Sequence, residues 1–296
     1  MNQKYICLYP SRFKLDGGAM FGIIPKPLWN KRIPADEYNR IEMSLRSLLI
    51  QRDNKIIIID SGCGDYQGQK FNERFALAST LKSFDQLLAQ HQLKREQVSD
   101  VILTHLHFDH CGGLLCGQQL ELTFPNATLH LHRRQYQHAQ NPTARDKGSY
   151  QIEHIENFVG QYEKKDQLHW LEGENGFIVG DLNFQTCHGH TPYQILPYNS
   201  EMMYGADLVP TAHHVDLPWV MGYDLHPGKS TEDRLEVYQF LIEKNLYYIF
   251  DHDLEFIAGR LRKKERGFEF YQLISSQQAS SEEFTLNSFS VSECDK

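Results

Sequence analysis

At residues 104–110 the chain reads Thr-His-Leu-His-Phe-Asp-His, directly after the apolar run Val101-Ile102-Leu103. The imidazoles of His105, His107 and His110 and the carboxylate of Asp109 fall within six consecutive positions. Imidazole nitrogens and carboxylate oxygens are the ligands that borderline divalent metals prefer. A strand that ends in such a cluster can direct several ligands at one point. The stretch predicts a metalloenzyme, and a polar surface loop is the less favoured interpretation.

Length and composition limit the class of protein. The chain has 296 residues, of which 41% are hydrophobic, and its formal net charge is −8, from 30 basic and 38 acidic residues. This length and apolar content suit one large α/β domain with a sizeable core. The mildly acidic balance argues against nucleic acid or an anionic membrane as the main partner. We therefore expect a small-molecule substrate.

Targeting signals and cysteine usage favour a cytoplasmic location. The first ten residues lack the shape of a signal peptide, and no later run approaches the ~18 apolar residues of a membrane span. Six cysteines, at positions 7, 63, 111, 116, 187 and 294, form no CxxC pair. Reduced thiols in a cytoplasm are the expected state.

Hydrophobic periodicity predicts two successive sets of strands and helices. Helices are expected at 80–92 and 230–244, the second with Ser230 as its N-cap and Asp233 near its positive end. Strands are expected at 47–50, 55–60, 100–104, 128–133, 177–179, 183–187, 194–198, 201–204 and 246–250, with a hairpin turn at 52–54.

No linker divides the chain, so residues 1–275 are predicted to form a single domain. The polar segment 134–170 is interpreted as an insertion over the active site, where lids and substrate pockets are often built. The tail, residues 276–296, is rich in Ser, Gln and Glu and is predicted to be flexible.

The HxHxDH pattern resembles the metallo-β-lactamase superfamily, and four further stretches resemble its other signatures in the family's order. The resemblance implies an α/β fold, a four-layer αββα sandwich. The four stretches are Asp60-Ser61-Gly62-Cys63-Gly64, Gly189-His190-Thr191-Pro192, Gly205-Ala206-Asp207 and Phe250-Asp251-His252-Asp253.

The same resemblance implies a dinuclear centre. Asp207 would bridge two divalent ions, with zinc as the default and iron, manganese or cobalt as alternatives. Asp60 would orient a ligand, and Asp109 and Asp207 would be the catalytic carboxylates, with Asp109 also accepting or passing a proton. Histidine rather than glutamate at position 107 favours hydrolysis over oxygen reduction. The implied ligands of the first metal are His105, His107 and His190, and those of the second are Asp109, His110 and His252.

The N-terminal stretches Asp16–Gly22 and Pro25–Trp29 resemble a lactonase-like branch of the superfamily, which includes quorum-quenching N-acyl homoserine lactone lactonases and is related to organophosphate hydrolases. The same segment could instead form the contact of a homodimer. The resemblance implies a substrate wall made by Phe21, Trp29, His213, Trp219 and Tyr223.

One departure concerns a tyrosine that known lactonases carry three residues after the bridging aspartate. Pro210 stands there in this chain. Either another group, such as His213, His214 or Tyr223, replaces the tyrosine, or the preferred substrate differs.

Several interpretations compete. His188 is a rival of His190 as a metal ligand, and His130 and His132 are interpreted as satisfied strand histidines rather than a further metal site. The leading function is hydrolysis of a lactone or related ester, with N-acyl homoserine lactone as the most specific candidate. Phosphotriester or phosphodiester hydrolysis, thioester hydrolysis and a non-catalytic metal-binding sensor are the alternatives.

Overall fold

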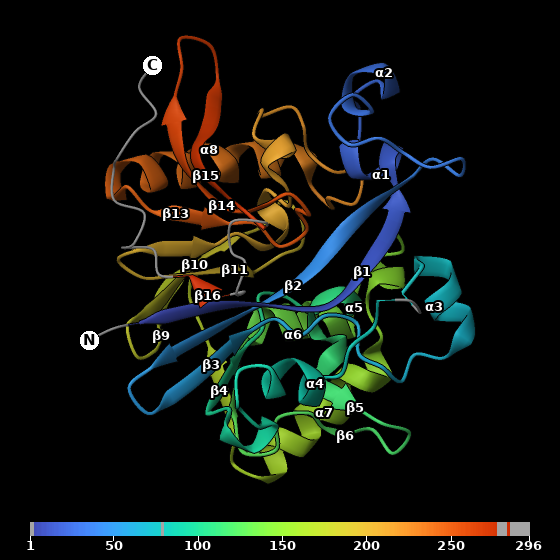
Figure 1. Ribbon diagram of the computed structural model, residues 1–296, viewed down its shortest axis with the longest axis vertical. Coiled ribbons are helices and arrows are strands. Elements are labelled where there is room, and N and C mark those ends of the chain that lie inside the picture. The colour runs from blue at the N-terminus through green and yellow to red at the C-terminus, as the bar shows by residue number, and fades with distance from the viewer. Residues whose placement is uncertain (1–2, 78–79, 277–282, 285–296) are drawn as a thin grey trace.

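Two seven-stranded sheets face each other, and helices cover the outer face of each (Figure 1). The computed structural model describes residues 3–77, 80–276 and 283–284. Helix α8 (Pro227–Lys244) lies along one sheet, while α4 (Phe84–Ala89), α6 (Arg133–Gln140) and α7 (Ile152–Lys164) lie on the opposite side of the molecule. This arrangement confirms the predicted αββα sandwich.

The first sheet has the order β16-β1-β2-β3-β4-β7-β8. Its pairs from β16 to β3 are antiparallel, and those from β3 to β8 are parallel. The β2–β3 hairpin turns at Asp53, which has a positive φ of 52°, as the predicted turn requires. The strands are β1 (Lys4–Asp16), β2 (Arg40–Arg52), β3 (Lys55–Ile59), β4 (Asp100–Ile102), β7 (Thr128–His132), β8 (Leu168–Leu171) and β16 (Glu283–Phe284).

The second sheet has the order β15-β14-β13-β12-β11-β10-β9 and is antiparallel except for the parallel pair β12–β13. The predicted strand at 194–198 coincides with β11. The strands are β9 (Asn175–Val179), β10 (Leu182–Cys187), β11 (Gln194–Tyr198), β12 (Met202–Tyr204), β13 (Tyr247–Ile249), β14 (Phe256–Lys263) and β15 (Phe268–Ser275), and a separate two-stranded sheet pairs β5 (Leu115–Cys116) with β6 (Glu121–Leu122).

The remaining helices are short. They are α1 (Gly17–Phe21), α2 (Lys26–Trp29), α3 (Gln69–Phe75) and α5 (Phe108–Cys111), together with the 3-10 turns η1 (Arg95–Gln97), η2 (Gly112–Leu114), η3 (Lys147–Ser149), η4 (Ala206–Leu208) and η5 (Ala212–His214). The predicted helix at 80–92 is reduced to α4, which begins at the capping box of Ser83 and Gln86.

The predicted start of the long C-terminal helix is wrong. Helix α8 begins at Pro227, because proline is well suited to the first helical position, and Ser230 therefore lies inside the helix rather than at its cap. The Asp233 carboxylate accepts hydrogen bonds from the backbone N–H groups of His188 and Gly189, at 2.7 and 2.9 Å. Asp233 thus ties α8 to the loop that carries His190.

Strand β3 shows why the two sheets stack. Ile57 and Ile59 pack between the sheets, while Ile56 and Ile58 pack against the helices on the outer face. A strand that is buried on both faces is apolar at every position, which explains the isoleucine run. Burial of each such side chain contributes about 1.5–3 kcal/mol.

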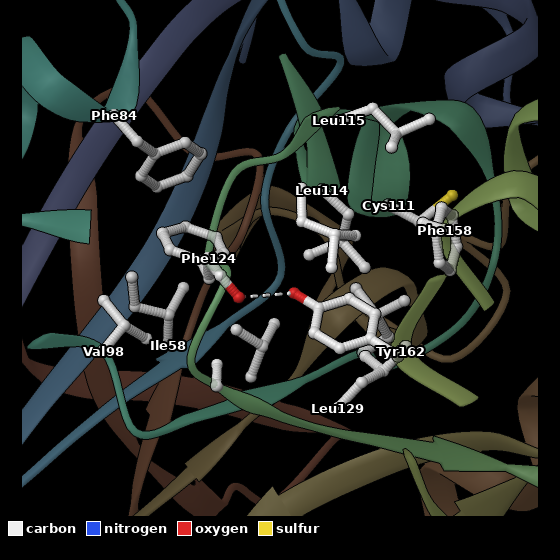
Figure 2. Close-up of a cluster of buried hydrophobic side chains, with 14 of the residues drawn as sticks. Ile58, Phe84, Val98, Cys111, Leu114, Leu115, Phe124, Leu129, Phe158 and Tyr162 are labelled. Atoms are coloured by element: carbon white, nitrogen blue, oxygen red, sulfur yellow. Dashed lines mark hydrogen bonds between the residues drawn. The ribbon is translucent and has the colours of Figure 1, made fainter. Parts of the chain in front are cut away.

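Figure 2 shows the outer layer beneath the first sheet, where Ile58 and Leu129 from the strands meet Phe84, Phe158 and Tyr162. The Tyr162 hydroxyl donates a hydrogen bond of 3.1 Å to the backbone oxygen of Phe124. The segment predicted as an insertion, 134–170, therefore supplies core side chains from α7 to this layer.

The C-terminal segment is described in part. Residues 283–284 form β16, which pairs with Tyr5 and Ile6 of β1. The other residues predicted to form a flexible tail lie outside the described residues, apart from Ser276. Across the described ranges, none of the helices combines the length and the apolarity needed to cross a bilayer.

Candidate metal centre

Loops from both sheets converge at one edge of the sandwich. His105 and His107 follow β4, and Asp109 and His110 lie on α5, directly after them. The loop between β10 and β11 carries His190, the turn after β12 carries Asp207, and His252 follows β13. The two halves of the chain therefore each supply part of the cluster.

Close packing fixes the turn that carries Asp207. A Cβ atom at Gly205 would lie 1.8 Å from the Cζ atom of Tyr248 on β13, so only glycine fits there. The Tyr248 hydroxyl donates to the Gly205 carbonyl at 3.0 Å and accepts from the Val209 N–H at 2.9 Å. These contacts hold Asp207 between the imidazoles.

Asp207 lies at the centre of the cluster. Its Oδ2 atom is 3.1 Å from His190 Nε2, 3.5 Å from His110 Nε2 and 3.9 Å from His105 Nε2. Its Oδ1 atom is 3.0 Å from His252 Nε2. Oδ2 therefore faces three imidazoles, and Oδ1 faces a fourth.

Two sets of potential ligand atoms, each within 4.8 Å of one another, share Asp207. One set is His105, His107, His190 and Asp207, and the other is His110, Asp207, Asp251 and His252. Asp109 borders the second set, because its Oδ2 atom lies 3.7 Å from His252 Nε2 and 3.8 Å from His110 Nε2.

Asp251 and Asp60 contact the far side of the His110 ring. Their Oδ2 atoms lie 3.1 and 2.9 Å from His110 Nδ1, whereas His110 Nε2 faces Asp207. We therefore assign Asp251 to holding the imidazole and leave the ligand position to Asp109. Sequence reasoning gave Asp60 this role and missed it for Asp251, although Asp251 directly precedes His252.

Other imidazoles are also held through the nitrogen that faces away from Asp207. His190 Nδ1 lies 3.0 Å from the carboxylate of Asp224, and His252 Nδ1 lies 2.8 Å from the backbone oxygen of Ser44. Such contacts set the tautomer and the orientation of a metal-binding imidazole. Asp224 was missed because it belongs to no motif of the chain.

Three ring nitrogens in the cluster call for a ligand. Among the residues that the structure describes, the Nε2 atoms of His105, His107 and His110 have no hydrogen-bond partner, and all three side chains are buried. A buried polar atom without a partner is costly, and a cation would satisfy it. Nitrogen and oxygen donors arranged in this way fit zinc and related divalent ions.

The charges of the cluster agree with this interpretation. Burial, followed by the neighbouring imidazoles, lowers the pKa of His105 and His107 well below the usual value. Both imidazoles are therefore neutral and can bind a metal ion through a ring nitrogen. Burial would raise the pKa of Asp207, but His190 and His252 outweigh it and hold that pKa well below the usual range. The ionised Asp207 carboxylate beside the neutral imidazoles of His105 and His107 would attract a cation.

A family model described as the metallo-beta-lactamase superfamily matches residues 46–252. The chain belongs to this superfamily. A search of the curated proteins finds no match.

Solved structures share the fold of this metallo-β-lactamase superfamily member. A probable metal-dependent hydrolase from Staphylococcus aureus superposes with a TM-score of 0.83 at 25% identity, over 93% of this chain and 98% of that one. AidC, a dizinc quorum-quenching lactonase, gives 0.74 at 21% identity over 91% and 94% of the two chains. The hydrolase AbOPH gives 0.72 at 20% identity over the same shares. The family and fold support the prediction of a hydrolase.

In this superfamily member a cavity of about 250 Å³ opens over the cluster. Five residues of the cluster line it: His107, Asp109, His190, Asp207 and His252. Its other lining residues are Leu15, Met20, Arg74, Phe75, Phe108, Arg145, Gly148, Ser149, Met221 and Tyr223. The segment predicted to lie over the active site thus contributes Arg145, Gly148 and Ser149.

Most of the predicted substrate wall lies elsewhere. Phe21 and Trp29 are buried and stack at 5.4 Å, and Phe21 also stacks on His214 at 4.4 Å. Trp219 packs edge-on against Phe21, with the Arg32 guanidinium 3.7 Å from its ring. These rings pack against one another rather than lining the cavity, and the packing buries Phe21 and Trp29 almost completely.

Tyr223 does line the cavity, unlike His213 and His214. His214 bonds to Thr211 Oγ1 and to the backbone oxygen of Met20, so its ring nitrogens are both engaged. Of the groups considered as replacements for the lactonase tyrosine, only Tyr223 reaches the site. Pro210 contacts the cluster through its backbone, because its carbonyl accepts a hydrogen bond of 3.0 Å from the backbone N–H of His252.

The rival histidines are engaged away from the cluster. His188 Nε2 lies 2.9 Å from Glu174 Oε2 and its Nδ1 accepts from the Tyr193 N–H. His130 Nε2 lies 2.8 Å from Asp100, and His132 Nε2 lies 3.0 Å from the Gly173 carbonyl. These partners favour structural roles for the three residues.

Proposed function

We propose that this protein is a dinuclear metal hydrolase that opens a lactone or cleaves a related ester, with N-acyl homoserine lactone as the most specific candidate. The single observation that carries the proposal is the position of Asp207. It is shared by two sets of buried donors, and its carboxylate oxygens lie 3.0–3.9 Å from four imidazole nitrogens.

The residues fit two ions. His105, His107 and His190 would hold one, and Asp109, His110 and His252 the other, with Asp207 between them. When bound, two such cations lower the pKa of a shared water and polarise the oxygen of the scissile bond.

The protein's own groups perform the remaining tasks. Burial raises the pKa of Asp109, which lines the cavity, so this carboxylate is the one suited to accept a proton from the attacking water and return it to the leaving oxygen. Carboxylates orient two of the imidazoles: Asp60 and Asp251 contact His110, and Asp224 contacts His190. The Tyr223 side chain lies at the cavity, where its hydroxyl can contact the substrate.

Lactone hydrolysis is supported by shape as well as by chemistry. AidC, whose solved structure contains the product N-hexanoyl-L-homoserine, shares the fold over 91% of this chain. Leu15, Met20, Phe75 and Met221 give the cavity an apolar wall for an acyl chain. Phosphotriester or phosphodiester hydrolysis is the second candidate, because Pro210 removes the lactonase tyrosine and the same cations would stabilise a phosphoryl oxygen.

Metal analysis and a substrate panel test the proposal together. Metal-loaded protein is assayed with acyl homoserine lactones, a paraoxon-type triester and bis-nitrophenyl phosphate, and metal per chain is measured on the same samples. Turnover of the lactones with about two ions bound is the expected result. A protein that holds both ions and cleaves no panel member would contradict the proposal.

Variants test the assignment of the ligands. Asp207→Ala should lower metal content from about two ions toward one and reduce the rate by at least ~100-fold. His188→Ala is the matched control for His190→Ala, because His188 lies two residues away and bonds to Glu174 instead. Equal losses in the two histidine variants would mean that the ligand was assigned to the wrong residue.

A further inference from the structure

Two arginines line the active-site cavity. Arg74 is on α3 and Arg145 is in the loop between α6 and η3, and both border the space above Asp109 and Asp207. Both side chains are exposed. They come from segments that are 71 positions apart, 145 minus 74, so the fold brings them to one opening.

Neither guanidinium is neutralised by an acid. Within the described part of the chain, no carboxylate lies within salt-bridge distance of Arg74 or Arg145. Arg145 donates instead to the backbone oxygens of Gly222 and Asp224. An arginine that bonds to carbonyl oxygens keeps its full positive charge.

The helix that carries Arg74 is fixed to the metal-binding loop. The rings of Phe71 and Phe75 lie 5.2 and 4.8 Å from that of Phe108, which stands between His107 and Asp109 in the sequence. The Arg74 guanidinium lies 5.4 Å from the Phe75 ring. The helix therefore brings Arg74 to the cavity beside the reacting groups.

The segment that carries Arg145 is also held by hydrogen bonds. Next to it, Asp146 accepts a hydrogen bond of 2.7 Å from Thr143 and lies 2.7 Å from His138 Nε2. The bonds of Arg145 to Gly222 and Asp224 flank Tyr223, which also lines the cavity.

We propose that the preferred substrate carries an anionic group, a carboxylate or a phosphate, which Arg74 and Arg145 bind while the ester or lactone lies over the metal-binding residues. This inference rests on the proposed hydrolase function and specifies its substrate class. An unmodified N-acyl homoserine lactone is neutral, so a lactone whose acyl chain ends in an anion should be recognised better. The apolar side chains Leu15, Met20 and Met221 would contact the chain between the two ends.

Arginine is suited to this task. Its planar fork matches both carboxylate and phosphate geometry, and charge-assisted hydrogen bonds are stronger than neutral ones. The exposure of both side chains limits the gain, because solvent and salt screen charges at the surface. We expect a preference of roughly tenfold for the anionic ligand.

Binding of ring-opened products tests the inference without turnover. Zinc-loaded full-length protein is titrated calorimetrically with N-hexanoyl-homoserine, with its adipoyl counterpart, whose acyl chain ends in a carboxylate, and with a 6-phosphonooxyhexanoyl counterpart. All three compounds share the homoserine carboxylate, and two carry a second anion at the end of the acyl chain. The wild type should bind at least one of these two roughly tenfold more tightly than the hexanoyl compound. The tighter of the two anionic compounds identifies the group that is recognised.

Arg74→Ala should reduce this preference to about threefold or less. Lys70→Ala is the matched control, because Lys70 is exposed on the same helix, one turn earlier, and does not line the cavity. The preference of the wild type should also fall as salt is raised from about 50 to 500 mM.

The outcomes separate this inference from the proposed function. Equal binding by the wild type of the hexanoyl compound and of the compounds with a second anionic group, or an equal loss in Lys70→Ala and Arg74→Ala, would overturn the inference even if lactones are hydrolysed. A preference for anions that Arg74 controls would support it, whereas absence of any turnover in the substrate panel would count against the hydrolase proposal alone.

Discussion

Replacement of Asp224 by asparagine isolates the contact that orients His190. The carboxylate is buried, with Oδ1 3.0 Å from His190 Nδ1 and Oδ2 3.3 Å from the backbone N–H of Met221. Asparagine has the same shape but no charge. It can still accept from His190, and its amide NH₂ then faces the N–H of Met221, donor against donor.

The magnitude follows from these two contacts. A hydrogen bond to a charged group contributes about 1.5–3 kcal/mol and a neutral one about 0.5–1.5, so the loss of charge costs about 1–1.5 kcal/mol. The opposed donors add about 1 kcal/mol. Burial lowers the pKa of His190, but Asp207 and Asp224 outweigh it and raise that pKa to about 9 in the metal-free protein. Asp224 therefore also stabilises the protonated His190, which must lose its proton to bind metal, and this cancels part of the cost of the substitution. The net loss of about 1.4–2 kcal/mol corresponds to roughly 10- to 30-fold weaker metal binding.

Competition with a chromophoric chelator measures this affinity directly. Asp216→Asn is the control, since Asp216 lies in the same region, is 39% exposed in its side chain and pairs with Arg32 at 3.0 Å. Unchanged metal affinity in Asp224→Asn, or an equal loss in Asp216→Asn, would refute the assigned role of Asp224.

Three further predictions concern stability. Tyr162→Phe should lower the free energy of unfolding in urea by about 1 kcal/mol, because the Phe124 carbonyl loses the hydrogen bond from the tyrosine but keeps the one from the Ala127 N–H. An unchanged free energy of unfolding would mean that the hydrogen bond in Figure 2 contributes nothing to stability. Removal of metal with EDTA should lower the melting temperature by roughly 10 °C, and added zinc should restore it, because a metal ion at a free concentration of about 1,000 times its Kd stabilises the fold by about 4 kcal/mol. Equal melting temperatures with and without EDTA would argue against bound metal. Burial would raise the pKa of Asp100, but hydrogen bonds, above all the one to His130, lower that pKa from 3.8 to about 2. Between pH 3.8 and about 2 the unfolded state therefore binds more protons than the folded state, and the stability of the fold falls as the pH drops through this window. Asp100→Asn should flatten the stability curve in this window, and a parallel decline in both proteins would be inconsistent with that shift.

Short motifs in the sequence were sufficient for the central part of the cluster, and their resemblance to the metallo-β-lactamase superfamily implied the sandwich. The isoleucine run of β3 requires burial on both faces, which is a property of the strand itself. His105, His107, Asp109 and His110 lie within six positions, so a single turn after β4 brings them together wherever the rest of the chain goes.

Other elements could not be predicted from local patterns. Strand β1 carries Lys, Arg and Ser among its apolar residues and has an irregular register between Leu8 and Ser11, so its period of two is broken. It becomes a strand because β2 offers a long edge to pair with. The start of α8 was misjudged because Ser230 resembles a cap, whereas Pro227 begins the helix.

The sequence by itself determined the positions of many strands, through periodicity, and the residue types able to bind metal, through short motifs whose resemblance to the superfamily implied the two-sheet architecture. Only the tertiary structure decided which groups lie behind the imidazoles and which line the cavity. Asp224 and Asp251 act through contacts 34 and 141 positions away, with His190 and His110, and Phe21 and Trp29 are withdrawn into an aromatic stack. Contacts at such separations are set by how whole layers pack, and no short stretch of sequence encodes that packing.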